Sequence, residues 1–159
     1  YIIGTGNGET SVFCIYYFLR RMKEIGKIID LPLETTSTGD FVSIDDKKQQ
    51  IPFRVKRAYW IYGVPQGENR GGHAHKQLRQ VIIAAKGSFT VNLDDGHEKK
   101  QYHLTRPDQG LFLDTEIWRT LDNFSPGAVC LVLASEPYDA DDYLYEYEEF
   151  LDYISSRKR

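Results

Sequence analysis

The feature that most constrains this chain is residues 70–76, Arg-Gly-Gly-His-Ala-His-Lys, in which two histidines stand two positions apart. In an extended strand alternate side chains point to the same face, so His73 and His75 are predicted to project together. The glycines before the pair let the chain turn tightly into the strand, because they have no Cβ to clash. An apolar, β-branched run follows at residues 80–85, and Gly87 ends it. The pattern predicts two short strands that carry a pair of convergent imidazoles.

Short strand-like segments separated by turn residues occupy most of the chain after residue 23, which predicts an all-β sandwich or barrel. In residues 57–62 the alternation places Arg57, Tyr59 and Ile61 on one face. Residues 94–96, Asp-Asp-Gly, predict a tight hairpin. The tail has apolar residues at helical spacing and predicts an amphipathic helix over 139–157, packed on the barrel. The other expected strands are 25–33, 41–44, 53–62, 88–93, 98–104, 110–113 and 128–134, with a polar turn at 35–40.

Composition excludes several classes of protein. At 159 residues, 41% of them hydrophobic, the chain has enough apolar material for one good core. A net charge of −3 argues against non-specific binding to nucleic acid. The apolar run at residues 12–19 is too short to span a bilayer. Cys14 and Cys130, far apart in apolar runs, suggest neither a disulfide framework nor a zinc site. We therefore expect a cytoplasmic protein with no nucleic-acid or membrane partner.

Residues 1–21 differ in character from the rest of the chain. The charged pair Arg20 and Arg21 follows the apolar run, the reverse of the order in a signal peptide. Met22 is the only methionine, and the domain-like pattern begins just after it. Our hypothesis is that Met22 is the natural start, that residues 1–21 are a non-native or disordered extension, and that 22–159 form one domain.

The spacing around the histidine pair resembles the first motif of the cupin barrels, except that metal-binding cupins have glutamate where this chain has Gln80. Those cupins take a third histidine from a second motif, which here begins at Gly110 and places Leu121 at the ligand position. Two of the four ligands are therefore lost. Divalent metals normally need three or more protein ligands. We expect that the protein uses neither a metal nor another cofactor.

Imidazoles that bind no metal are available for proton transfer. An unperturbed histidine titrates near pH 6.5, so it can accept and return a proton at cellular pH. The alternative is that His73 and His75 only form hydrogen bonds inside the barrel. Their common face, beside Arg70 and Lys76 and facing Tyr59, favours a functional site.

A set of further residues extends the likeness over most of the chain, from about residue 24 to residue 153. Together they resemble the dTDP-sugar 3,4-ketoisomerases, the WxcM-like cupins, much more specifically than the general cupin pattern does. The residues that carry the resemblance are the 70–76 segment, Gln80, Asp94-Asp95-Gly96, Gly110-Leu111, Trp118, Phe124-Ser125, Leu133-Ala134-Ser135, Tyr138-Asp139 and Asp142-Tyr143.

The resemblance implies a cupin jelly-roll barrel, a homodimer and an isomerase that works without a metal. It implies that the substrate is dTDP-4-keto-6-deoxyglucose, which is converted to its 3-keto isomer for the amino sugars of surface polysaccharides. The family's catalytic histidine falls on His73 and its catalytic tyrosine on Tyr59, while His75 lines the same pocket. The chemistry suits these groups, because one base can move a proton from C3 to C4 while a phenol bonds the two oxygens.

Six further residues are expected to bind the substrate. The nucleotide diphosphate favours cationic side chains, and fixed donors stabilise negative charge that develops on the sugar. The residue after the family's tryptophan varies with the stereochemistry at C4, and Arg119 resembles the gluco-product members. A second such position, Thr38, resembles neither group. The expected substrate-binding residues are Arg57, Arg70, Lys76, Gln80, Trp118 and Arg119.

Three other functions stay open at this point. The chain could be a non-catalytic cupin that binds a sugar nucleotide, against which the complete set of His73, His75 and Tyr59 argues. It could be a metal-dependent cupin oxygenase, which Gln80 and Leu121 disfavour. The nearest enzymatic rival is a 3,5-epimerase of the same substrate, whose pairing of histidine with an acid has no match in this sequence.

Overall fold

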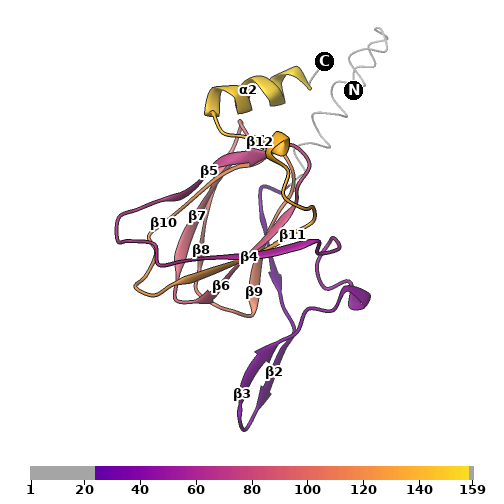
Figure 1. Cartoon of the computed structure of the whole chain (residues 1–159), viewed down its shortest axis with the longest axis vertical. Helices are drawn as coiled ribbons and strands as arrows, with labels where there is room; N and C mark the ends of the chain where they lie inside the picture. The colour runs from indigo at the N-terminus through magenta and orange to yellow at the C-terminus, as the bar shows by residue number, and fades with distance from the viewer. Residues whose placement is uncertain (1–23, 158–159) are drawn as a thin grey trace, which may run out of the picture.

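The computed structural model describes residues 24–157, so the predictions for residues 1–21 and Met22 lie outside the described residues. Two five-stranded antiparallel sheets face each other as a jelly-roll sandwich, as predicted (Figure 1). The first sheet has the order β1 (Lys27–Asp30), β9 (Gln109–Leu113), β6 (Gln80–Lys86), β11 (Val129–Ala134) and β4 (Arg57–Tyr62). The second has the order β12 (Tyr143–Leu144), β5 (Arg70–His75), β10 (Trp118–Asp122), β7 (Phe89–Asp94) and β8 (Lys99–Leu104).

The main core fills the space between the two sheets. Ile82 and Leu111 of the first sheet belong to the same buried cluster as Val91 and Leu93 of the second. Val91 and Leu93 are at alternate positions of β7 and therefore share the face that points to the other sheet. The predicted hairpin is confirmed between β7 and β8, which pair from Asp94 and Lys99 onward.

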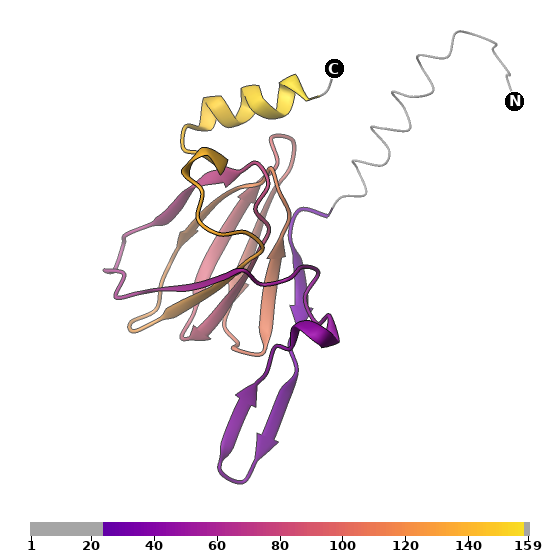
Figure 2. The same cartoon turned by 45° about the vertical axis from the view of Figure 1, so that its right-hand side comes forward.

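Residues 31–55 cover the outer face of the first sheet and also form a projecting arm. The apolar side chains of Leu31 and Phe53 pack with those of β6 and β11, and η1 (Asp46–Lys48) lies in this segment. Between them, β2 (Leu33–Thr36) and β3 (Gly39–Val42) pair only with each other and extend away from the barrel (Figure 2). The predictions of a strand over 25–33 and a turn over 35–40 were therefore wrong in their bounds.

The C-terminal segment differs from its prediction. The helix α2 (Tyr147–Ser156) is half the predicted length, although Phe150 and Ile154 bury its apolar face as expected. Residues 140–144 instead form η2 (Ala140–Asp142) and the short strand β12, which pairs with the end of β5. The cause is a contact with a distant segment: the Asp142 carboxylate accepts hydrogen bonds from the backbone N–H groups of Gln77 and Leu78 and so ties this segment to the barrel.

The sequence pattern does not predict strand β10, which lies at the centre of the second sheet between β5 and β7. Its side chains alternate, with Arg119 and Leu121 buried and Trp118 on the opposite face. Trp118 packs on Tyr147 and Phe150 beneath α2, with ring centroids 5.3 Å and 5.8 Å apart. Within residues 24–157, no helix is long and apolar enough to cross a membrane.

Candidate active site

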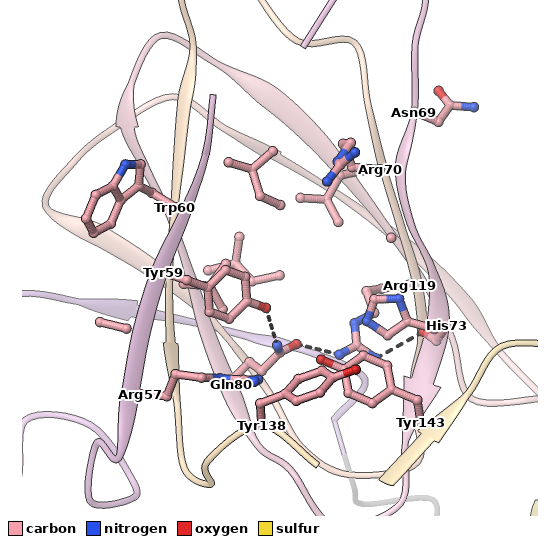
Figure 3. Close-up of a pocket in the computed structure, with 16 residues that line it drawn as sticks. Arg57, Tyr59, Trp60, Asn69, Arg70, His73, Gln80, Arg119, Tyr138 and Tyr143 are labelled. Atoms are coloured by element: carbon pink, nitrogen blue, oxygen red, sulfur yellow. Dashed lines mark hydrogen bonds between the residues drawn. The ribbon is translucent and has the colours of Figure 1, made fainter. Parts of the chain in front are cut away.

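A cavity of about 650 Å³ opens between the two sheets, a size that suits a small-molecule ligand. Its walls come from β4, β5, β6, β10 and β11, together with Tyr138 and Tyr143 from the segment before α2. Figure 3 shows Tyr59 on one side of the cavity and His73 on the other, with Gln80 and Arg119 between them. Two predicted catalytic residues therefore face one pocket.

A bulge in β5 positions His73. The register against β10 pairs His73 with Arg119 but Gly71 with Thr120, so Gly72 is the extra residue. Both glycines have positive φ, of 83° and 73°, which other residues rarely adopt. A Cβ on Gly71 would also lie 2.8 Å from the backbone oxygen of Arg119. The Gly-Gly pair therefore allows a bulge that brings β5 and β10 together at the site, a common use of bulges in enzymes.

Strand β4 supplies the opposite wall. Its partly buried and exposed residues alternate along Arg57–Tyr62, as the sequence predicted, so Arg57, Tyr59 and Ile61 face inward. All three line the pocket. The indole of Trp60 projects to the other face and is 61% exposed, although it contributes to the pocket's rim.

A chain of hydrogen bonds joins Tyr59 to the β5 backbone across the pocket floor. The Gln80 amide donates from Nε2 to Tyr59 Oη at 2.9 Å, and Arg119 donates to Gln80 Oε1 at 2.6 Å. Arg119 also donates to the carbonyl oxygen of His73 at 3.0 Å. Because Arg119 fixes which end of the Gln80 amide faces Tyr59, the phenol oxygen accepts a bond there and keeps its own proton for another partner.

The electrostatics of the pocket keep His73 neutral. Burial, and next the positive charge of Arg119, lower the pKa of His73 from 6.5 to about 3, although a backbone hydrogen bond with Gly71 opposes the change. A neutral imidazole can accept a proton, which is the property a general base needs.

The other two groups of the network keep their protons. Burial raises the pKa of Tyr59 above its usual value of 10, although the charges of Arg119 and Arg57 oppose this. Tyr59 is therefore a donor and not a phenolate. Burial lowers the pKa of Arg119 to about 10, so its guanidinium still carries a positive charge at neutral pH. With a side chain only 3% exposed, this charge lies inside the protein without a carboxylate bonded to it among residues 24–157.

His75 lies beside His73 but deeper. The two ring centroids are 5.0 Å apart, which agrees with the predicted common face. His75 is only 2% exposed and is not part of the pocket lining, so it does not line the pocket as the resemblance implied. Its Nδ1 is 3.0 Å from the Asp142 carboxylate, and burial, followed by the charge of Arg119, lowers its pKa strongly. This places His75 behind the pocket wall, next to His73.

The pocket is positively charged although the whole chain is not. Arg57, Arg70 and Arg119 line it, and no aspartate or glutamate does. The Arg57 guanidinium lies 5.1 Å from the centroid of the Tyr59 ring and 5.7 Å from that of Tyr138. Its Nε and one terminal nitrogen are buried and make no hydrogen bond within residues 24–157. Since buried donors are normally satisfied, these nitrogens point to an anionic ligand.

Two of the predicted substrate-binding residues do not reach this pocket. The Lys76 ammonium instead donates to the backbone oxygen of Asp141 at 2.8 Å, which helps to hold the segment before α2. Trp118 is on the face of β10 that packs under the helix. Trp118 is next to the pocket residue Arg119 in sequence, but strand alternation turns its side chain away, whereas Lys76 follows the end of β5.

The residues of the pocket do not fit a metal ion. Among residues 24–157 there is no group of three or more histidine, cysteine, aspartate or glutamate side chains that could hold one. At the two positions where metal cupins have a glutamate and a third histidine, Gln80 bonds Tyr59 and Arg119, while Leu121 lines the pocket. The buried charge of Arg119 beside Gln80 would also repel a cation.

Sequence reasoning did not assign site roles to three polar residues of the pocket, namely Asn69, Tyr138 and Tyr143. The ring of Tyr143 lies 5.0 Å from that of His73 and 4.3 Å from that of His75. The helical spacing of Tyr143 and Tyr147 suggested that Tyr143 belongs to the C-terminal helix, so its place in the pocket was not predicted. The signal that could have found it is the Asp142-Tyr143 pair, which belongs to the family resemblance but was given no role.

Comparisons with known proteins agree with this geometry. Residues 24–155 match the family described as FdtA: WxcM-like, C-terminal. A TDP-4-oxo-6-deoxy-alpha-D-glucose-3,4-oxoisomerase from Aneurinibacillus thermoaerophilus is 40% identical over 129 residues, which are 81% of this chain and 92% of the relative. A 3,4-ketoisomerase from Helicobacter canadensis has 39% identity and a TM-score of 0.79, over 83% of this chain and 99% of its own. A mutant of the QdtA 3,4-ketoisomerase from Thermoanaerobacterium thermosaccharolyticum, solved in complex with TDP-4-keto-6-deoxyglucose, has 35% identity and a TM-score of 0.81, over 86% and 98%.

Proposed function

The chain belongs to the WxcM-like, C-terminal family of FdtA, and we propose that it is a 3,4-ketoisomerase of a dTDP-linked sugar. The substrate is dTDP-4-keto-6-deoxyglucose, and the product carries its ketone at C3. The observation that carries this proposal is one pocket that combines a neutral histidine, a protonated tyrosine and three arginines without any carboxylate. This combination suits proton transfer on an anionic sugar nucleotide.

The first step removes the proton from C3 of the sugar. His73 accepts this proton, because its imidazole is neutral and lies on the pocket wall. The electron pair of the C3–H bond becomes the double bond between C3 and C4, and the C4 carbonyl becomes an enediolate oxygen. His73 then returns the proton to C4, the proton of the C3 hydroxyl passes to O4, and the C3 carbonyl forms, so that the product carries a hydroxyl at C4. No electrons enter or leave, so the reaction needs no redox cofactor.

The enediolate concentrates negative charge on O3 and O4, and the pocket offers fixed donors for it. The Tyr59 hydroxyl can donate to one of these oxygens, because its own oxygen already accepts from Gln80. The same hydroxyl can pass a proton between O3 and O4. The buried charge of Arg119 stabilises the intermediate at short range, since the protein screens it less than water does.

The diphosphate needs cations at the pocket. Arg57 is the strongest candidate, because two of its nitrogens are buried without a partner within residues 24–157. Arg70 lies on the pocket wall toward the end away from Tyr138 (Figure 3). Bidentate guanidinium contacts with phosphate are among the stronger charge-assisted hydrogen bonds. The resemblance of Arg119 to the gluco-product members supports a product with the gluco configuration at C4, whereas Thr38 resembles neither group.

The test is incubation of the purified protein with dTDP-4-keto-6-deoxyglucose, followed by NMR of the product. We expect the 3-keto isomer, with the same rate in the presence of a chelator. Inversion at C3 or C5 with the ketone still at C4 would indicate a 3,5-epimerase. Binding without turnover would indicate a non-catalytic sugar-nucleotide protein. Strong inhibition by the chelator, reversed by one metal, would overturn the metal-free mechanism.

We also propose that the protein is a cytoplasmic homodimer. Leu33 and Phe41 on the β2–β3 arm are 45% and 50% exposed, and Trp60 and Tyr62 on the edge strand β4 are 61% and 70% exposed. A second copy would cover such apolar surface and pair the free edge. Light scattering should report a dimer at micromolar concentration, and the double change Leu33→Ser and Phe41→Ser should shift it toward the monomer. A monomeric wild-type protein would refute the proposal.

The place of the reaction in a sequence follows from its product. A 3-keto sugar nucleotide is the form that an aminotransferase can convert to a 3-amino sugar. We propose that the product is consumed in this way, for 3-amino-3,6-dideoxy sugars of surface polysaccharides. A coupled assay with such an aminotransferase should produce the amino sugar only when this protein is present.

A further inference from the structure

Three tyrosines line the pocket, namely Tyr59, Tyr138 and Tyr143, and Tyr138 is the most exposed of them, at 64%. Tyr143 lines the cavity, and within residues 24–157 its hydroxyl makes no hydrogen bond. By contrast, Tyr59 accepts a bond from Gln80, and Tyr147 donates to the Asp94 carboxylate at 2.7 Å. A phenol hydroxyl is both a donor and an acceptor, so the hydroxyl of Tyr143 is available to a molecule in the cavity. A bound ligand would supply its hydrogen-bond partner.

The fold holds Tyr143 rigidly at this position. The pair β12–β5 places Tyr143 opposite His75 in the register. Asp142, the preceding residue, accepts two backbone hydrogen bonds from Gln77 and Leu78. The Tyr143 ring stacks on that of Tyr145, with centroids 5.1 Å apart and planes at 12°. The first two contacts fix the backbone at Tyr143 and the third packs its ring, which suits a positioned donor.

The location of the Tyr143 hydroxyl connects it to the reacting groups. Its ring is tilted against that of His73 at 5.0 Å and meets the edge of His75 at 4.3 Å. Tyr143 lines the same cavity as Tyr59 and Arg119. Figure 3 shows Tyr143 beside His73, and Tyr59 across the pocket from both.

We propose that Tyr143 is a further catalytic residue, whose hydroxyl donates a hydrogen bond to one oxygen of the enediolate while Tyr59 serves the other. This inference rests on the proposed isomerase function. The reaction develops charge on two adjacent oxygens, O3 and O4. A single phenol would have to serve both, whereas two phenols on different walls can each hold one. Tyr143 forms no covalent bond with the sugar, and His73 still moves the proton from C3 to C4.

The test compares Tyr143→Phe with Tyr145→Phe. Each change removes one hydroxyl and keeps the stacked rings, but Tyr145 is 55% exposed and does not line the pocket. We expect Tyr143→Phe to lower kcat at least about 10-fold, as the loss of one donor to a developing oxyanion does. Tyr145→Phe should stay within about twofold of the wild type in kcat, since no polar contact with the sugar is lost. Both variants should bind dTDP and melt like the wild type.

The double variant Tyr59→Phe, Tyr143→Phe tests whether the phenols act on different oxygens. If they do, the two losses in kcat multiply, because independent contributions to the barrier add as free energies. A Tyr143→Phe variant that turns over at the wild-type rate would overturn this inference and leave the proposed function intact. A wild-type protein without isomerase activity would instead refute the proposed function, and the two failures are therefore distinct.

Discussion

Replacing His73 with asparagine should make the protein less sensitive to acid, because the wild type loses unfolding free energy below pH 6.5 and the variant lacks the group responsible. In the folded protein the pKa of His73 is lowered to about 3 from 6.5. Below pH 6.5 the unfolded chain takes up a proton at His73 and the folded chain does not. The free energy of unfolding therefore falls as the pH falls from 6.5 toward 3, and the variant is free of this loss.

The size of the effect follows from the shift. Each pH unit between the two pKa values costs 1.36 kcal/mol, so two units below pH 6.5 make about 2.7 kcal/mol at pH 4.5. The rings of His75, Tyr143 and Tyr145 surround His73, the Asp142 carboxylate lies against His75, and Arg119 is the charged side chain that shifts the pKa of His73 after burial itself. For a chain of this size the difference corresponds to about 5–10 °C in Tm.

The assay is urea unfolding of the wild type and of His73→Asn at pH 7.5 and at pH 4.5. The difference in unfolding free energy between the two proteins should move by about 2.7 kcal/mol in favour of the variant at the lower pH. His97→Asn is the matched control, because His97 is an exposed histidine in the turn between β7 and β8. The difference in unfolding free energy between the wild type and His97→Asn should be nearly the same at both pH values. A constant difference for His73→Asn would mean that the pocket does not keep His73 neutral, and would refute the electrostatic argument.

Two other substitutions probe the surroundings of the base. Tyr59→Phe should lower kcat about 10²-fold or more while dTDP affinity stays similar, because only the hydroxyl is lost; unchanged steady-state kinetics would remove Tyr59 from the mechanism. Asp142→Asn should destabilise the protein by about 1–3 kcal/mol in urea unfolding, because its carboxylate accepts from two backbone N–H groups and lies 3.0 Å from His75 Nδ1. Asp141→Asn, next to it and exposed, is the control, and equal stability of the two variants would contradict the role given to Asp142.

The parts of the fold that local pattern determines could be predicted from the sequence. Alternation defined β4 and its inward face with Arg57 and Tyr59, and the Asp-Gly turn defined the β7–β8 hairpin. The two histidines share a face because the strand period of two requires it. Both features depend on neighbours a few residues apart, which a sequence displays directly.

The missed parts depend on contacts between distant segments. Strand β10 places Arg119 inside the barrel, where an apolar residue is expected, and Gln80 and the His73 carbonyl accept its hydrogen bonds. The apolar spacing before α2 suggested a longer helix, but the backbone donors of Gln77 and Leu78 draw Asp142 into the β12 pairing instead. Neither partner is visible from the local pattern, and both determine which side chains enter the pocket.

The central claim is that His73 carries the proton between C3 and C4, and the most direct measurement is turnover of dTDP-4-keto-6-deoxyglucose by His73→Asn, followed by NMR in D₂O. Asparagine keeps a polar side chain of similar length but removes the base. We expect conversion to fall at least about 10²-fold, with the label at C4 of the product lost in proportion, while dTDP binding and the Tm at pH 7.5 change little. A folded His73→Asn protein that forms the 3-keto isomer near the wild-type rate would contradict the account.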